Sequence, residues 1–190
     1  NDTRQDAITP IVDALGNKNI HLLKNSGETD IGGGIVFNVL SVFDRENWVK
    51  PSDESKISIA LYHGSIHGCQ TSQGFVIEEG EDSVDIFKDF DFAMLGDIHK
   101  QQKMDHEGRV RYAGSTIQQN FGESINKGFL MWNIRGKSDW DCQHVSIVNP
   151  IPFITVDLTP KGKVPNTIVP KGCRLRIRST SNISPMMLKA

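Results

Sequence analysis

Apolar residues along the chain gather in short runs, and polar stretches with glycine or proline separate these runs. Such runs, bounded by turn residues, are typical of strands in a sheet. Three consecutive glycines at 32–34 predict a turn before the longest run. The pattern predicts strands at residues 19–23, 35–43, 57–63, 92–96, 110–116, 127–134, 142–148, 153–158 and 173–179.

Two segments instead have a pattern that indicates helices. Residues 4–16 place apolar side chains at helical spacing, carry Pro10 near the start and end on Gly16. Residues 83–92 are predicted to form a helix that leads into the next strand. Because buried strands and helices alternate in this way, we expect an α/β layered fold.

A boundary is predicted near the end of the chain. The stretch "NPIPF" at 149–153 contains two prolines, and proline interrupts strand pairing. We therefore expect one unit over residues 1–149 and the beginning of a second unit over 150–190.

Polar side chains that can bind metals stand at the ends of two predicted strands. His63 closes the strand at 57–63, and Asp97 and His99 follow the strand at 92–96. Ligands usually bind at strand ends in an α/β sheet. Imidazole nitrogen and carboxylate oxygen suit Mn²⁺, Zn²⁺ or iron, and Gly96 would let the backbone bend before Asp97. A D-x-H pair alone is a weak signal, and the alternative is that these histidines only form hydrogen bonds in loops.

A second polar stretch, "YAGSTIQQNFGE" at 112–123, follows a predicted strand. Its turn contains Gly114, Ser115 and Thr116, whose backbone N–H groups and hydroxyls could bind phosphate oxygens. Lys100 precedes this turn in the sequence, and its charge would make the surroundings of the turn basic. The alternative is an ordinary turn.

Charge is distributed unevenly, although the composition is that of an ordinary globular protein. The net charge of −2 combines a basic C-terminal segment with an acidic remainder. Beyond Pro160 there are seven lysines or arginines and no acidic residue. This asymmetry favours a polyanion as partner, and the alternative is a solvated strand face.

Composition also bears on the compartment. The chain has no run of apolar residues long enough to span a membrane. Its three cysteines are an odd number without a close pair, which fits a reducing compartment inside the cell and argues against a disulfide framework.

The segments "DFDFAMLGDIHKQQ" and "RVRYAGSTIQQNFGESINKGFLMW", in this order, resemble the calcineurin-like metallophosphoesterases. Within that family they are most similar to the SbcD-type DNA repair exonuclease subunits, which include the meiotic-recombination nucleases. The resemblance is strongest over 87–132 and weak beyond 153. It implies a layered metallophosphoesterase β-sandwich flanked by helices over 1–149, truncated at its N-terminus, and the start of a small DNA-capping domain over 150–190.

The resemblance implies a function and a set of site residues. His63, Asp97 and His99 would bind two divalent metal ions, expected to be Mn²⁺, while Lys100, Ser115 and Thr116 would contact nucleic acid. The protein would be a nuclease subunit, exonuclease or endonuclease, that hydrolyses DNA in repair or recombination. Its implied partners are DNA, an SbcC-type ABC ATPase with a coiled coil, and a second copy of the nuclease subunit.

Two departures from the family pattern matter. Asp97 stands where the family usually has a histidine, and the early metal motifs, together with the proton-donating histidine, are absent from these residues. We therefore expect a portion of a longer protein, without a complete catalytic set and inactive by itself. Two alternatives stay open: a calcineurin-like phosphatase or cyclic-nucleotide phosphodiesterase, and a non-catalytic DNA-binding module whose metal site has decayed.

Overall fold

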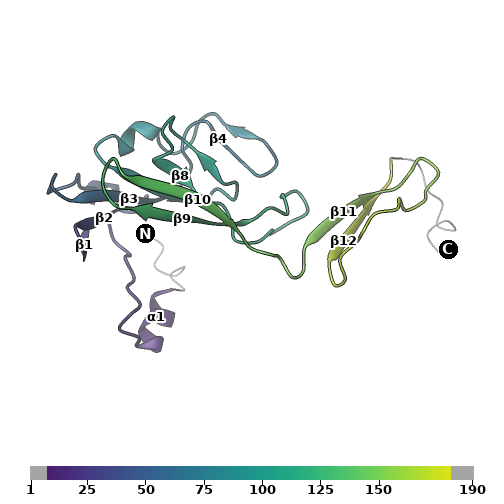
Figure 1. Cartoon of the computed structure of the whole chain (residues 1–190), viewed down its shortest axis with the longest axis horizontal. Coiled ribbons are helices and arrows are strands. Elements are labelled where there is room, and N and C mark those ends of the chain that lie inside the picture. Colours follow the sequence, from purple (N-terminus) through teal and green to yellow (C-terminus); the bar gives the residue numbers. More distant parts are fainter. Residues whose placement is uncertain (1–7, 181–190) are drawn as a thin grey trace.

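A six-stranded sheet forms the centre of the computed structural model, which describes residues 8–180 (Figure 1). The strand order is β1-β2-β3-β6-β8-β7, and the four inner strands run parallel, while β1 and β7 pair antiparallel at the edges. The strands are β1 (Gly27–Gly32), β2 (Ile35–Leu40), β3 (Ile57–His63), β6 (Phe92–Gly96), β7 (Gln102–Lys103) and β8 (Val110–Tyr112).

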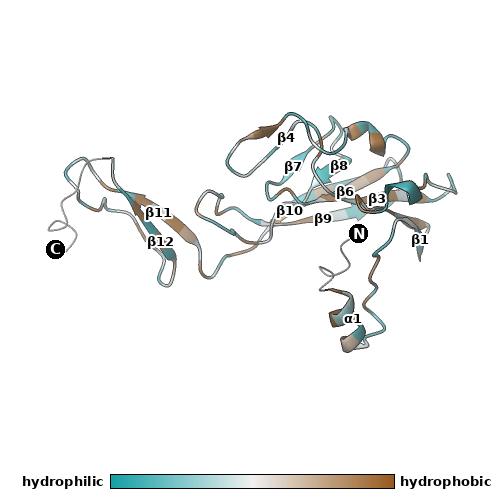
Figure 2. Cartoon of the chain, turned by 180° about the vertical axis from the view of Figure 1, so that it is seen from behind, coloured by the Kyte–Doolittle hydropathy of each residue, from teal (hydrophilic) through white to brown (hydrophobic). Residues whose placement is uncertain are grey.

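Three two-stranded sheets complete the described strands. β4 (Cys69–Gln70) pairs with β5 (Val76–Ile77), and β9 (Gly128–Ile134) forms a hairpin with β10 (Trp140–Ser146). β11 (Phe153–Asp157) and β12 (Arg174–Arg178) pair in parallel and stand apart from the main sheet at one end of the molecule (Figures 1 and 2).

The two faces of the main sheet are buried to different degrees. One face packs into the core, where residues of β2, β3, β6 and β8 meet the loops that follow β3. The opposite face is covered in part by the β9–β10 hairpin, whose Trp132 and Trp140 contact Phe92 edge-on. Farther along this face, Val39, Leu61 and Met94 are only half-buried. The core face consists of Leu40, Ala60, Tyr62, Ala93, Leu95 and Tyr112.

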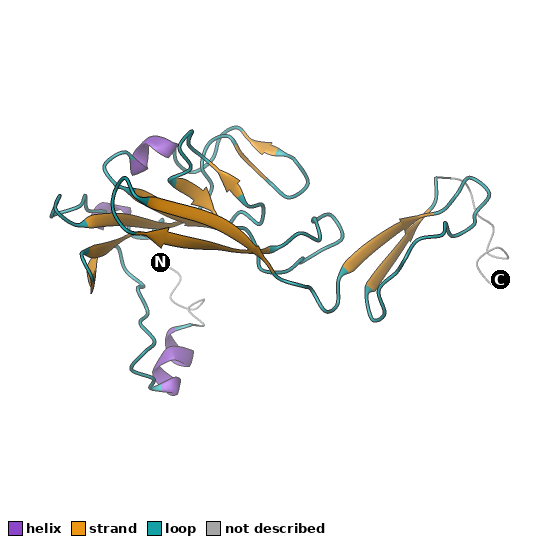
Figure 3. Cartoon of the chain, in the orientation of Figure 1, coloured by secondary structure: helices purple, strands orange, loops and turns teal. Residues whose placement is uncertain are grey.

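The predicted α/β layered fold is wrong. The described residues are mostly β-structure in small sheets, and strands predominate over helices in Figure 3. α1 (Thr9–Leu15) is the one α-helix among the described residues. It is seven residues long, buries none of them, and extends away from the sheet (Figure 1). A metallophosphoesterase β-sandwich flanked by helices therefore does not describe this structure.

The two segments with a helical pattern differ from the prediction in extent. The segment 83–92 forms only a short 3₁₀ helix, η3 (Val84–Phe87), and this single turn places Phe87 in the core. α1 ends at Gly16, as predicted, in a left-handed conformation with φ of 55°. The part of the predicted helix before residue 8 lies outside the described residues.

Most predicted strands are confirmed, because apolar runs between turns pair within sheets. The exception is 19–23, which forms no strand. The glycine turn is confirmed at 32–34, between β1 and β2. The unit boundary at 149–153 stays a prediction. None of the described helices combines the length and the apolar composition that a membrane crossing requires.

Candidate functional site

Two neighbouring parallel strands bring the predicted metal-binding residues to one end of the main sheet. This end, where the parallel strands have their carboxyl ends, is called its edge. β3 pairs with β6, and His63, the last residue of β3, stands opposite Gly96, the last residue of β6. Asp97 and His99 follow directly. Because both strands end at the same edge, residues that are more than thirty positions apart in the sequence become neighbours.

His63 and Asp97 form an open pair at this edge. The distance from His63 Nε2 to Asp97 Oδ1 is 3.8 Å, and their side chains are 79% and 49% exposed. Asp97 has a φ of 85°, which is rare outside glycine and marks local strain. The prediction that Gly96 makes the bend is therefore wrong, since the unusual backbone conformation falls on Asp97. Gly96 instead leaves room for His63, because a Cβ there would lie 2.6 Å from His63 Nδ1.

His99 is held differently, by a buried carboxylate. Its Nδ1 lies 2.9 Å from Oε1 of Glu123, whose side chain is only 2% exposed, while the His99 side chain is 40% exposed. Burial alone would raise the pKa of Glu123, but hydrogen bonds from His99, from Gln119 N–H and from Lys127 lower it below its usual value. Glu123 is therefore ionised at neutral pH.

Lys127 completes this cluster. Its ammonium lies 3.1 Å from Oε2 of Glu123, and its side chain is 6% exposed. The same ammonium donates to the backbone carbonyl of His99 at 2.6 Å and to Ser72 Oγ at 3.3 Å. The side chain of His99 is thus held through Glu123, and its backbone through Lys127.

Tyr112 supports the loop that follows His63. Its hydroxyl donates to the carbonyl of Gly64 at 2.7 Å and accepts the N–H of Ile66 at 2.9 Å. The side chain is fully buried, and burial raises the pKa of its hydroxyl well above the ordinary value. Tyr112, the last residue of β8, therefore holds the backbone of the loop behind the metal-binding edge.

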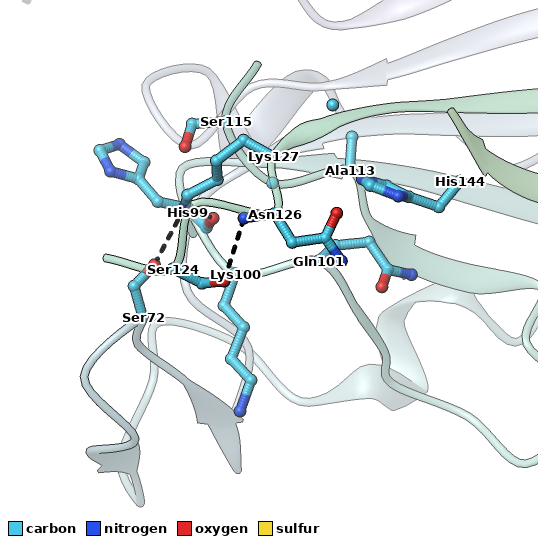
Figure 4. Close-up of a pocket in the computed structure, with 12 residues that line it drawn as sticks. Ser72, His99, Lys100, Gln101, Ala113, Ser115, Ser124, Asn126, Lys127 and His144 are labelled. Carbon is cyan, nitrogen blue, oxygen red and sulfur yellow. Dashed lines mark hydrogen bonds between the residues drawn. The ribbon is translucent and has the colours of Figure 1, made fainter. Parts of the chain in front are cut away.

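A pocket of about 370 Å³ lies beside His99, and two of the three residues predicted to contact nucleic acid line it (Figure 4). Lys100 and Ser115 both line it, and the Oγ of Ser115 is buried without a hydrogen-bond partner among the described residues. The ammonium of Lys100 bonds to Gln70. Thr116 is exposed and is not among the residues that line this pocket.

A smaller hollow of about 240 Å³ brings Asp97 and His99 together, with Glu123 in its wall. Carboxylate oxygen and imidazole nitrogen are suitable donors for Mn²⁺ or Zn²⁺. Their number falls short, because no three His, Cys, Asp or Glu side chains gather closely enough within residues 8–180 to hold an ion. The residues therefore fit part of a metal site, and further ligands would have to complete it.

Three residues of this region were not predicted as site residues. Glu123 and Lys127 belong to the quoted family-like stretch, but a carboxylate 24 residues beyond His99 gives no sequence signal of contact. Their spacing of four positions is common in helices, and here it occurs in a loop. His144 of β10 lines the larger pocket on the side opposite the His99 ring (Figure 4).

The loop that carries Glu123 is also bonded to β11. Nε2 of the buried Gln118 donates to the carbonyls of Glu123 and Phe153, and Oε1 accepts the N–H of Phe153. The rings of Phe121 and Phe153 pack edge-on at 4.9 Å between centroids. The basic C-terminal sheet is thus attached directly to the loop that positions His99.

No protein-family model matches the chain. An uncharacterized protein of Acanthamoeba polyphaga mimivirus is 34% identical over 188 residues. The match covers 93% of this chain but 14% of that protein, so the chain spans about one seventh of the length of its relative. The relative's name states no activity.

Proposed function

We propose that this chain is part of a metal-dependent phosphodiesterase that cleaves DNA, as in the SbcD-type nuclease subunits that its sequence resembles. The observation that carries the proposal is the edge where β3 and β6 end. Three side chains of metal-binding type, His63, Asp97 and His99, follow these two paired strands. One of them is held by a buried carboxylate, and another has a strained backbone, and both features are common at functional sites.

The three side chains would serve as ligands of divalent ions, with Mn²⁺ as the expected metal. Bound ions of this kind lower the pKa of water and neutralise charge on a phosphate. Asp97 supplies an oxygen donor, which suits a hard cation. Glu123 and Lys127 keep His99 in place, and Tyr112 keeps the loop behind His63 in place. The remaining ligands and the proton donor would come from other parts of the longer protein.

Exposed arginines on β12 support DNA as the substrate. Arg174 and Arg176 stack over the rings of Phe153 and Phe121 at 4.7 and 4.9 Å, which keeps their guanidinium groups extended on the surface. Contacts of such groups with phosphates give affinity that falls with salt and depends little on sequence. Lys100, Ser115 and Thr116 would add contacts to phosphates next to the cleaved bond.

The resemblance also supplies the proposed partners and location. These are an SbcC-type ATPase, a second copy of the nuclease subunit, and an intracellular site of action. The three cysteines, all free among the described residues, agree with a reducing compartment.

The test is a nuclease assay on the longer protein that contains this chain. With Mn²⁺ it should degrade linear duplex DNA, and His99→Ala should abolish the activity without unfolding the protein. His106→Ala is the matched control, because His106 is exposed in the turn before β8, at the opposite edge of the sheet. Full activity in the His99→Ala variant would refute the site. Hydrolysis of a small phosphoester without activity on DNA would instead indicate a calcineurin-like phosphatase or cyclic-nucleotide phosphodiesterase.

A second candidate is a DNA-binding module without catalysis, which the exposed arginines of β12 favour. For the 190-residue chain alone we expect no substantial turnover. Salt-dependent DNA binding by the longer protein, with no Mn²⁺-dependent cleavage under any condition that retains the fold, would support this candidate over the nuclease.

A further inference from the structure

The ion pair of Glu123 and Lys127 is unusual for this chain. Among the ion pairs of residues 8–180, it is the one in which both side chains are less than a tenth exposed. Removing two charges from water is costly and is tolerated when every group is well paired. Such a pair requires an explanation beyond stability, and its position against the exposed His99 supplies one.

Four donors surround the carboxylate of Glu123. Oε1 accepts from the His99 ring at 2.9 Å and from Asn120 Nδ2 at 3.2 Å. Oε2 accepts from the Gln119 N–H at 3.1 Å and lies 3.1 Å from the ammonium of Lys127. Both oxygens are therefore occupied, and the carboxylate cannot turn without losing hydrogen bonds.

This arrangement decides which ring nitrogen of His99 carries the proton. A carboxylate only accepts hydrogen bonds, so Nδ1 of His99 must be the N–H donor. In the neutral ring, Nε2 then keeps its lone pair. The ring is 40% exposed and lines the same hollow as Asp97, and Nε2 is the ring nitrogen that Glu123 does not engage.

We propose that Glu123 is a positioning residue that fixes His99 as the Nδ1–H tautomer and presents Nε2 for metal binding. Lys127 holds the carbonyl of the same residue, so the ring and the backbone are fixed together. This inference rests on the proposed function, since it gives His99 a metal to bind. Carboxylates that hold metal-binding histidines in this way typically raise metal affinity by about 10- to 100-fold.

The experiment is NMR spectroscopy of the 190-residue chain with ¹⁵N-labelled histidine, which distinguishes the two tautomers by their nitrogen shifts. In the wild type at neutral pH, we expect His99 to be mainly Nδ1–H. In Glu123→Gln the amide can donate to Nδ1, so the main form should change to Nε2–H. His106 serves as the internal control, and its tautomer should be the same in both proteins.

The outcomes separate this inference from the nuclease proposal. A wild-type His99 that is mainly Nε2–H would overturn the inference, as would an unchanged tautomer in a folded Glu123→Gln variant. If that variant fails to fold, the wild-type tautomer decides alone. If His99 has the predicted tautomer but the longer protein has no Mn²⁺-dependent nuclease activity, the positioning role is retained and the nuclease proposal is rejected. Loss of Zn²⁺ affinity by about 10-fold or more in Glu123→Gln would support the positioning role of Glu123.

Discussion

The sheet edge where β3 and β6 end has two halves that are built differently. In the anchored half, His99 is fixed by the buried pair of Glu123 and Lys127. In the open half, His63 and Asp97 are exposed and meet at 3.8 Å without a hydrogen bond between them. Both halves present the same kinds of donor atom, so the difference lies in how they are held.

Because of this difference, only the anchored half is held in place by contacts within the described part of the chain. His99 is held by contacts within the chain, whereas the side chain of His63 is 79% exposed. Asp97 keeps a left-handed backbone conformation, with a φ of 85°, that is costly for a residue other than glycine. We infer that the open half becomes ordered only when a ligand, such as a metal ion, binds to it.

Breaking the anchored half should have the largest effect. Lys127→Met leaves the buried carboxylate of Glu123 without its charge partner, and we expect a loss of about 3–5 kcal/mol of unfolding free energy. Arg135→Met is the matched control, because Arg135 forms exposed ion pairs, which contribute little to stability. Urea unfolding of both variants measures the difference, and equal losses would show that the buried pair does not anchor the site.

Alkaline pH should remove the support of the open half. Burial raises the pKa of both tyrosines of the chain, Tyr62 in β3 and Tyr112 behind His63, above the ordinary value of about 10. Because the pKa is higher in the folded than in the unfolded state, the unfolding free energy does not depend on these groups below about pH 10. It falls as the pH rises further. Above this pH, each tyrosine lowers the unfolding free energy by at most about 1.4 kcal/mol per pH unit.

Phenolate absorbance and circular dichroism during a titration from pH 8 to 12 provide the measurement. We expect phenolate to appear only together with loss of the fold. Ionisation near pH 10 in a protein that remains folded would contradict the burial of the two hydroxyls.

The strain at Asp97 should appear as a gain when it is relieved. Glycine adopts a φ of 85° without penalty, so Asp97→Gly should stabilise the fold by about 1 kcal/mol. Asp97→Ala should give no such gain, because it removes the same carboxylate and keeps the penalty. Thermal unfolding of both variants is the comparison, and equal stabilities would argue against strain.

Gly96→Ala should have the smallest effect on stability. The three atoms nearest to the new methyl group all belong to the exposed ring of His63, which can turn away, so we expect a change of less than about 0.5 kcal/mol. The contact of His63 with Asp97 should nevertheless be lost. Gly128→Ala is the contrast, because its methyl group would collide with the backbone carbonyl of Val145 in the paired strand. A similar stability for these two variants would contradict the difference between a movable ring and a fixed backbone.

Much of the candidate site follows from sequence because it depends on strand ends. The apolar runs at 57–63 and 92–96 formed paired parallel strands, so His63 and Asp97 became neighbours. The prediction of a helix at 83–92 is wrong because a single apolar turn gives helical spacing without a long helix. Glu123 could not be found, since its contact with His99 depends on a loop path that no periodic pattern records.

Paramagnetic broadening by Mn²⁺ tests the central claim, that His63, Asp97 and His99 belong to one metal-binding edge. During a Mn²⁺ titration of the 190-residue chain, we expect the signals of these three residues to broaden first and together. The signal of His106, which precedes β8 at the opposite edge of the sheet, should stay sharp. Broadening that follows general surface exposure, or that leaves His99 unaffected while His106 broadens, would contradict the claim.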